Sequence, residues 1–594
     1  MDKKRKELES LLARVQKPAR YLGNEWNAVN KDHSQVAFKL ALAFPDLYEV
    51  GMSNQGLKIL YHSVNMHENL LMERVFAPHP DLEAEMRRHS FPLFTLESAR
   101  PLAEFDLIGF SLQYELSYTN VLNMLNLAGI PLHSSERDDR WPLIIGGGPC
   151  VFNPEPLAPF FDIFVLGEAE EILPALMLAL ADLKETGEGR SAVLKKLAAL
   201  EGIYVPSFYE PRYAADGQLL AIDQIEKTAP EKIKKRVIGD LNKAPYPTAP
   251  VVPYIQAVHD RAVVEFFRGC ARGCRFCQAG YVFRPVRRRS RQNIINLAKN
   301  LINETGYDEL SLSSLSSSDY PEIEQLLEDL DSELQGERVR CSLPSLRLDS
   351  YSIKLADRLH QGKRSSLTFA PEAATERLRR VIRKNIREED IFKALDDAIK
   401  GGWQGFKLYF MIGLPTESDA DVLAIIELCR AIRERYRRQV KGPLKLSVSV
   451  STFVPKANTP FQFEPQLPLE KIRQRQQILI DGFRKLPGVS LSWHEAETSY
   501  LEAIFARGDR RLAKLIERAW QLGCRLDGWS EHFAYNLWLQ AMQDSGINGD
   551  AYAGKRFNYN QCLPWEHLDC GISKEHFIKE HELALLESGE EGEL

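Results

Sequence analysis

The chain has 594 residues, of which 44% are hydrophobic and 27% charged, and its formal net charge is −6. This length exceeds what one hydrophobic core supports, so several domains are expected. The net charge excludes a global electrostatic attraction to nucleic acid or to an anionic membrane. No apolar run reaches the ~18 residues of a membrane span, and the charged start lacks the apolar stretch of a signal peptide. We therefore expect a cytoplasmic protein with no membrane contact.

The first third of the chain alternates short apolar runs with helical patterns. After a charged helical entry segment at 1–34, strands are predicted at 36–44, 105–112, 142–148 and 161–167. Helices are predicted to start at Ser53 or Asn54 and to cover 116–129 and 168–183. Short strands that alternate with helices indicate parallel βαβ units. The pattern predicts a Rossmann-like domain at residues 35–185.

A second βα series follows a connecting region at 186–260, which contains the Pro-rich linker 244–254. Its predicted strands are 262–267, 309–315, 339–345, 366–370, 405–413 and 444–453, with helices at 291–304, 321–334, 350–361, 374–401, 418–438 and 468–485. Six consecutive units predict a partial (β/α)6 barrel at 261–485, with its chemistry at the C-terminal ends of the strands. Residues 486–594 are predicted to be mainly helical with an acidic tail. The fold class is therefore α/β.

Three cysteines crowd together directly after the first barrel strand, as Cys270-x3-Cys274-x2-Cys277. In a reducing compartment this crowding indicates a metal rather than disulfides. Closely spaced thiolates hold cubane iron–sulfur clusters, and a loop with three of them leaves one iron open to a small molecule. Zinc is the main alternative, but it usually needs a second Cys or His pair, and none lies nearby.

This run resembles the C-x3-C-x-aromatic-C signature of the radical SAM superfamily, with Phe276 in the aromatic position. The resemblance implies a [4Fe–4S] cluster on the three cysteines, whose open iron binds S-adenosylmethionine (SAM). It also implies reductive cleavage of the S–C5′ bond of SAM to methionine and a 5′-deoxyadenosyl radical. The electron would come from a partner, either a reductase or a flavodoxin- or ferredoxin-type protein.

By the same resemblance, SAM contacts are expected where successive barrel strands end. The segment 371–379, Pro-Glu-Ala-Ala-Thr-Glu-Arg-Leu-Arg, is similar to the P-E-A-G-T-x-R-L-R segment of the methylthiotransferase-like branch, with Ala374 in place of glycine. Each residue alone could be a helix cap or a surface charge, so the argument is their joint placement. The candidate SAM-binding residues are Phe276, Ser317, Asp319, Arg347, Glu372 and Gly413.

Residues 35–185 resemble the cobalamin-binding domains that precede the barrel in many radical SAM proteins. Those domains often carry D-x-H-x-x-G, whereas this chain has Tyr48 in the His position of Asp46–Gly51, and a phenol is a poor cobalt ligand. The alternative is a vestigial domain in which the glycines only form tight turns, so the sequence leaves open whether cobalamin is bound. The candidate cobalamin-binding residues are Tyr48, Gly51, Gly147, Gly148, Gly167 and Glu168.

The whole arrangement resembles the cobalamin-binding-domain radical SAM proteins that have no assigned reaction and a methylthiotransferase-like core. It predicts a radical SAM enzyme for methyl or other radical transfer, with the substrate unnamed. One alternative is a methylthiotransferase-like enzyme acting on RNA or protein. That class carries a second cluster on three N-terminal cysteines, and the first 260 residues contain only Cys150. The other alternative is a non-catalytic iron–sulfur sensor or electron-transfer protein.

Two further features stay open at this point. Cys562, His567 and Cys570 fall within nine residues and fit either a second metal site or a packed aromatic tail. Arginine runs at 284–291 and 377–384 fit either phosphate groups of RNA or a nucleotide-like substrate, or a solvated helix face.

Overall fold

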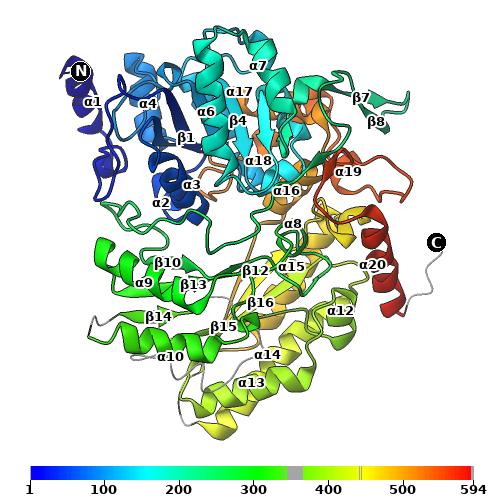
Figure 1. Ribbon diagram of the computed structural model, residues 1–594. Coiled ribbons are helices and arrows are strands. Elements are labelled where there is room, and N and C mark those ends of the chain that lie inside the picture. The colour runs from blue at the N-terminus through cyan, green and yellow to red at the C-terminus, as the bar shows by residue number, and fades with distance from the viewer. Residues whose placement is uncertain (1, 337–338, 344–365, 441, 443, 590–594) are drawn as a thin grey trace.

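The computed structural model describes residues 2–336, 339–343, 366–440, 442 and 444–589. Two α/β units lie one above the other, with the N-terminal unit at the top of Figure 1 and the barrel strands below it. Among the described residues, no helix combines the length and the hydropathy needed to cross a membrane. The α/β fold class with a helical C-terminal region is confirmed.

The N-terminal unit is built on a six-stranded sheet in the order β2-β1-β3-β4-β5-β6. Its strands are β1 (Phe38–Phe44), β2 (Leu70–Phe76), β3 (Leu107–Ser111), β4 (Leu143–Gly147), β5 (Ile163–Val165) and β6 (Ile203–Tyr204). The first five are parallel and β6 runs antiparallel to β5. Its helices are α1 (Asp2–Leu12), α2 (Tyr48–Gly51), α3 (Gln55–Asn65), α4 (Pro80–His89), α5 (Tyr118–Leu127), α6 (Ile172–Glu185) and α7 (Arg190–Ala198).

The strand order changes direction between β1 and β3, because β2 lies on one side of β1 and the later strands on the other. Ligands of open parallel sheets bind outside the carboxyl ends of the strands at such a switch point. The N-terminal unit therefore has one preferred binding edge, and Figure 1 shows that this edge faces the barrel strands.

The predicted barrel strands are all present, but they form two parallel sheets in the described residues. β10 (Ala262–Glu265), β13 (Glu309–Ser313) and β14 (Arg340–Ser342) make one sheet, and β15 (Leu367–Glu372), β16 (Gly405–Ile412), β17 (Lys445–Thr452) and β18 (Val489–Trp493) make the other. The predicted helix at 350–361 lies outside the described residues. The other helices are α8 (Ala279–Val282), α9 (Arg291–Thr305), α10 (Ile323–Glu333), α12 (Glu376–Val381), α13 (Glu388–Lys400), α14 (Asp419–Gln439) and α15 (Leu469–Arg484).

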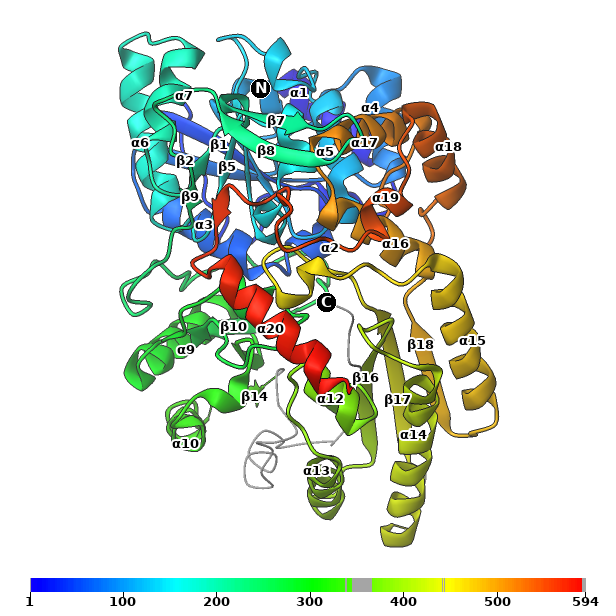
Figure 2. The same cartoon turned by 90° about the vertical axis from the view of Figure 1, so that its right-hand side faces the viewer.

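The connecting region and the C-terminal region both return to the N-terminal unit. Short strands β7 (Tyr209–Tyr213), β8 (Leu219–Gln224), β9 (Ile233–Lys234), β11 (Phe267–Arg268), β12 (Arg287–Arg288) and β19 (Leu568–Asp569) form two-stranded pairs. Helices α16 (Ala496–Arg507), α17 (Ala513–Leu522) and α18 (Tyr535–Ser545) share one hydrophobic core with the N-terminal sheet. α19 (Asp550–Ala553) follows, and α20 (Lys574–Glu587) runs down onto the barrel unit (Figure 2).

Candidate functional site

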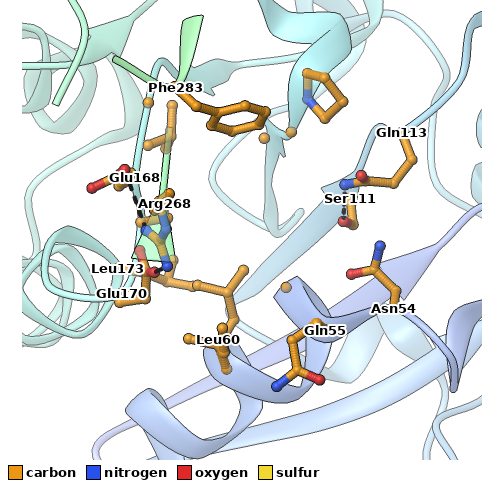
Figure 3. A pocket seen from close by; sticks show the side chains of 18 of the residues that line it. Asn54, Gln55, Leu60, Ser111, Gln113, Glu168, Glu170, Leu173, Arg268 and Phe283 are labelled. Carbon is orange, nitrogen blue, oxygen red and sulfur yellow. Dashed lines mark hydrogen bonds and ion pairs between the residues drawn. The ribbon is translucent and has the colours of Figure 1, made fainter. Parts of the chain in front are cut away.

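A cavity of about 380 Å³ lies between the binding edge of the N-terminal sheet and the first barrel strands. The N-terminal unit contributes residues of β1, β3, β4 and β5, and the barrel unit contributes residues of β10, β11 and β13. Figure 3 shows two kinds of polar group around it: neutral Asn54, Gln55, Ser111 and Gln113 on one side, and the ion pairs of Arg268 on the other. The site is thus shared by two units far apart in the sequence.

Gly147, at the end of β4, forms part of the floor of this cavity. A Cβ atom built on Gly147 meets no atom within 4 Å, so a side chain there would extend into the empty space. Gly148 has φ +107° and Gly167 has φ +101°, and a Cβ on either would collide with backbone atoms. These three glycines therefore shape an open surface that a flat ligand can approach closely.

The structure separates the six candidate cobalamin residues into two groups. Gly147, Gly148, Gly167 and Glu168 line the cavity, whereas Tyr48 and Gly51 do not. Tyr48 is 1% exposed, and its hydroxyl donates a hydrogen bond of 2.9 Å to Oε1 of Glu25. A Cβ on Gly51 would lie 2.2 Å from the ring of Phe76, so this glycine is required by packing. The D-x-x-x-x-G segment thus serves the interior of the domain in this chain.

Glu168 and Glu170 bind arginines of the barrel unit. Nη2 of Arg268 lies 2.6 Å from Oε1 of Glu170, and its Nη1 lies 3.3 Å from Oε1 of Glu168. Arg268 also donates to Glu265 over 2.9 Å, and Arg287 donates to Oε2 of Glu168 over 2.6 Å. Burial alone would raise the pKa of Glu168, but the two arginines outweigh it, and the pKa lies below its ordinary value. We call these five residues the interdomain clamp.

Arg268 was not predicted as a site residue from the sequence, and Arg287 was singled out only as part of the arginine run at 284–291. Their proximity to the cysteine loop could have indicated this role: Arg268 lies two residues before Cys270, and Arg287 lies in β12, which pairs with β11. The arginine run at 284–291 therefore belongs partly to the interior, since Arg287 is 8% and Arg289 2% exposed. Arg379 of the second run is fully buried. Neither run is a continuous basic surface of the kind that RNA backbones require.

The three cysteines lie in the loop between β11 and α8, where all are free thiols. Gly269 (φ +89°) and Gly273 (φ +69°) allow the loop to turn, because a Cβ on Gly269 would lie 2.7 Å from two carbonyl oxygens. Burial and the neighbouring Cys274 and Cys270 raise the pKa of Cys277 to about 11. Three neighbouring thiols, of which Cys274 is buried and the other two half-buried, are a donor set that an iron cluster can satisfy, since the metal deprotonates its thiol ligands.

The described residues contain no group of three or more His, Cys, Asp or Glu spaced to hold a single metal ion. A cubane presents a different iron to each thiolate, so its cysteines need not converge on one point. In the C-terminal tail, the Cys562 and Cys570 thiols donate to backbone carbonyls, and His567 is 5% exposed beside Glu155. Burial lowers the pKa of His567 to about 4. These three residues are packed side chains in the structure.

The candidate SAM contacts lie near the cysteine loop. Asp319 forms a bidentate ion pair with Arg272, which stands between Cys270 and Cys274. Phe276 packs against a small core that contains Ala373, which follows Glu372, and Leu414, which follows Gly413. The loop thus meets the ends of the first two strands and of β15 and β16.

The remaining candidate SAM-binding residues are Glu372, Gly413, Ser317 and Arg347. Glu372 ends β15 with φ +66°, a conformation rare for glutamate, and its Oε1 accepts a 3.1 Å hydrogen bond from Lys384. The amide of Gly413 donates over 2.6 Å to Oε2 of Glu417, whose pKa burial raises to about 7. Ser317 is fully buried with its hydroxyl 3.1 Å from that of Ser314. Arg347 lies outside the described residues.

Family models match both units of the chain. Residues 264–429 match the radical SAM superfamily, and residues 56–206 match the model described as radical SAM proteins, N-terminal. The fold and the cysteine loop therefore define an α/β protein with a radical SAM core. The chain belongs to the radical SAM superfamily, and this membership implies a [4Fe–4S] cluster and SAM as cofactors.

One relative is an uncharacterised protein of Methanocaldococcus jannaschii, 27% identical over 512 residues, which cover 86% of this chain and 97% of the relative. Two solved structures have similar folds. The methyltransferase TsrM of Kitasatospora setae, with cobalamin and a [4Fe–4S] cluster bound, is 14% identical with a TM-score of 0.47, covering 70% of this chain and 74% of its own. OxsB, a cobalamin-dependent radical enzyme with SAM bound, is 12% identical with a TM-score of 0.48, and the match covers 92% of this chain and 79% of OxsB.

Proposed function

We propose that this chain is a cobalamin-dependent radical SAM enzyme that cleaves SAM reductively and transfers a methyl group or another radical-derived group. The observation that carries the proposal is the position of the cavity. It extends from the switch point of the N-terminal sheet to Arg268 and Gly269, the residues directly before Cys270. A ligand held by the N-terminal unit would therefore lie beside the cysteine loop.

The lining of the cavity supports an uncharged, amide-bearing ligand such as a corrin. Asn54, Gln55, Ser111 and Gln113 offer neutral donors and acceptors, and the charges of the clamp largely neutralise one another. The remaining surface is apolar, from residues such as Leu40 and Phe283. Pockets of this composition hold large ligands by shape and orient them through a few polar groups.

Among the described residues that line the cavity, none is His, Cys, Met, Lys or Tyr. Tyr48 is held in the interior by Glu25 and is not available to a ligand in the cavity. We therefore propose that cobalamin is held here without a side-chain ligand to cobalt. When bound, cobalamin would supply a transferable methyl group, and the cluster would supply the electron that breaks the S–C5′ bond of SAM.

The residues of the barrel unit would bind and orient SAM. Cys270, Cys274 and Cys277 would hold three irons of the cluster, and Glu372 and the turn at Gly413 would contribute to the SAM-binding surface. The Glu372 carboxylate, held by Lys384, is suited to accept hydrogen bonds from hydroxyl or amino groups of SAM. The reaction needs a one-electron donor, and we propose a reductase or a flavodoxin- or ferredoxin-type protein.

The test is anaerobic reconstitution of the full chain with iron, sulfide and cobalamin. We expect about four irons per chain, a change in the EPR spectrum of the reduced cluster on adding SAM, and 5′-deoxyadenosine or S-adenosylhomocysteine with dithionite. A Cys274→Ala variant should lose the iron, whereas Cys429→Ala, a buried thiol in α14, should keep it. If the cluster is intact but its EPR spectrum does not change on adding SAM, the result would support a non-catalytic iron–sulfur sensor or electron-transfer protein instead.

The cobalamin part has its own spectrum. Any nitrogen superhyperfine splitting in the EPR spectrum of bound cob(II)alamin should come from its own dimethylbenzimidazole, so the spectrum should not change when the protein is labelled with 15N. A splitting that changes with the label, or no corrinoid binding at all, would contradict this part and leave the SAM chemistry standing.

A further inference from the structure

The C-terminal helix α20 (Lys574–Glu587) packs directly on the cysteine loop, about 300 residues away in sequence, which for a typical chain is far beyond local contact range. Figure 2 shows α20 crossing from the N-terminal unit to α12 of the barrel unit. α12 (Glu376–Val381) carries part of the segment that follows the candidate Glu372. The helix thus lies where the cysteine loop and the SAM-facing strand ends meet.

The main link is Arg275, which stands between Cys274 and Cys277 and is 2% exposed. Its Nε lies 3.2 Å from Oε2 of Glu580, and its Nη1 lies 2.5 Å from Oε2 of Glu587, both on α20. The same Nη1 donates to the carbonyl oxygen of Val381 over 2.8 Å. An arginine inside the cluster motif is therefore held by the last helix of the chain.

Two further contacts reach other parts of the loop. The ring of Phe577 packs edge-on against that of Tyr281 at 5.4 Å, and the Tyr281 hydroxyl donates over 3.0 Å to the carbonyl of Gly273. Glu580 also pairs with Arg383 at 2.7 Å, and Arg383 lies within 3.4 Å of a Cβ built on Gly273.

The aromatic residue of the motif completes the arrangement. Phe276 packs against the small core that includes Ala584 of α20, which is 1% exposed. α20 itself is anchored independently of the loop, because His581 lies 2.6 Å from Glu464 and 2.7 Å from the Tyr559 hydroxyl. A helix that is fixed elsewhere and contacts the loop at Arg275, Phe276 and Tyr281 restricts the positions of all three cysteines.

We propose that α20 is the positioning element of the cysteine loop: Glu580, through Arg275, keeps the loop closed around the cluster and shields it from solvent. This rests on the proposed cluster at Cys270, Cys274 and Cys277, not on cobalamin or on the identity of the substrate. Without Glu580, Arg275 keeps only the carboxylate of Glu587, whose side chain is 41% exposed, and the buried cation would draw water into the loop. The loop would then open more often, and the iron would escape.

The experiment compares Glu580→Gln and Arg275→Met with Glu575→Gln, an exposed glutamate in the first turn of the same helix. Reconstituted proteins are mixed anaerobically with an iron chelator, and bleaching of the cluster absorbance is followed. We expect bleaching at least about tenfold faster in the first two variants, which corresponds to ~1.4 kcal/mol of loop opening, and no change in the third. Amide hydrogen exchange of residues 270–284, measured in the apo proteins, should rise in the same two variants.

Bleaching and loop exchange at wild-type rates in Glu580→Gln would overturn the proposal. So would faster exchange spread equally over α13 and α14, because that would be general destabilisation. A wild-type chain that takes up no iron would instead overturn the proposed function. The apo exchange measurement would still show whether α20 positions the loop.

Discussion

Replacing Arg268 by Met removes the centre of the interdomain clamp. The guanidinium is 11% exposed and faces Glu170, Glu265 and Glu168 at 2.6, 2.9 and 3.3 Å. Loss of one partner from a buried ion pair typically costs about 3–5 kcal/mol. Glu168 keeps Arg287, so the lower end, about 3 kcal/mol, is expected here. That is roughly a 100-fold increase in opening of the seam between the two units.

The assay is amide hydrogen exchange of the two sides of the seam, residues 163–172 and 262–270. Both should exchange roughly 100-fold faster in Arg268→Met when exchange follows seam opening. Arg288→Met is the matched control, because Arg288 is exposed and adjacent to the clamp arginine Arg287. Unchanged exchange at the seam, or an equal increase in the control, would refute the reasoning. Cobalamin affinity should fall together with seam protection, because both units line the cavity.

Three other outcomes follow from single side chains. Gly147→Leu should lower cobalamin affinity at least about tenfold, whereas Gly239→Leu, also with free space but outside the cavity, should not. Glu372→Gln should keep the cluster yet require roughly 10- to 100-fold more SAM for the EPR change, because it loses charged hydrogen bonds of ~1.5–3 kcal/mol. As pH falls from 6.5 to about 4, wild type should lose up to ~3 kcal/mol of stability that His567→Phe does not lose.

The sign of the last prediction follows from proton binding. The unfolded chain takes up a proton at His567 near pH 6.5 and the folded chain only near pH 4, so acid favours unfolding between these values. The difference between wild type and variant isolates this residue from buried acids such as Glu417. Parallel pH profiles of unfolding would contradict it. Equal loss of affinity in both glycine variants, or unchanged SAM dependence in Glu372→Gln, would contradict the other two.

Local periodicity was sufficient to predict most strands and helices of both units, because parallel strands buried on both faces are continuous apolar runs. β2 was missed because Glu73 and Arg74 lie in its centre and both are almost fully buried. Their partners, Thr95 for Glu73 and Glu97 for Arg74, come from a distant loop that no local pattern reveals. Buried charged residues lower the mean hydropathy of a strand, so a hydropathy pattern does not reveal it.

The candidate site likewise combines features that are local in the sequence with contacts between distant residues. The cysteine spacing and the strand-end glycines are local features, and both could be predicted from the sequence. The clamp pairs between the two units and the contacts of α20 with the cysteine loop join residues more than 90 positions apart, such as Glu170 with Arg268, and follow only from the packing of the units. Tyr48 shows that the position of a residue in a motif does not establish its role, since its hydroxyl donates a hydrogen bond to Glu25 inside the domain.

The place of α20 at the end of the chain orders events during synthesis. The ribosome makes Cys270–Cys277 about 300 residues before α20, so at ~5–20 residues per second the loop remains uncovered for roughly 15–60 s. On the proposed roles of the cysteine loop and of α20, a cluster carrier would reach the thiols in this interval, before α20 covers the loop.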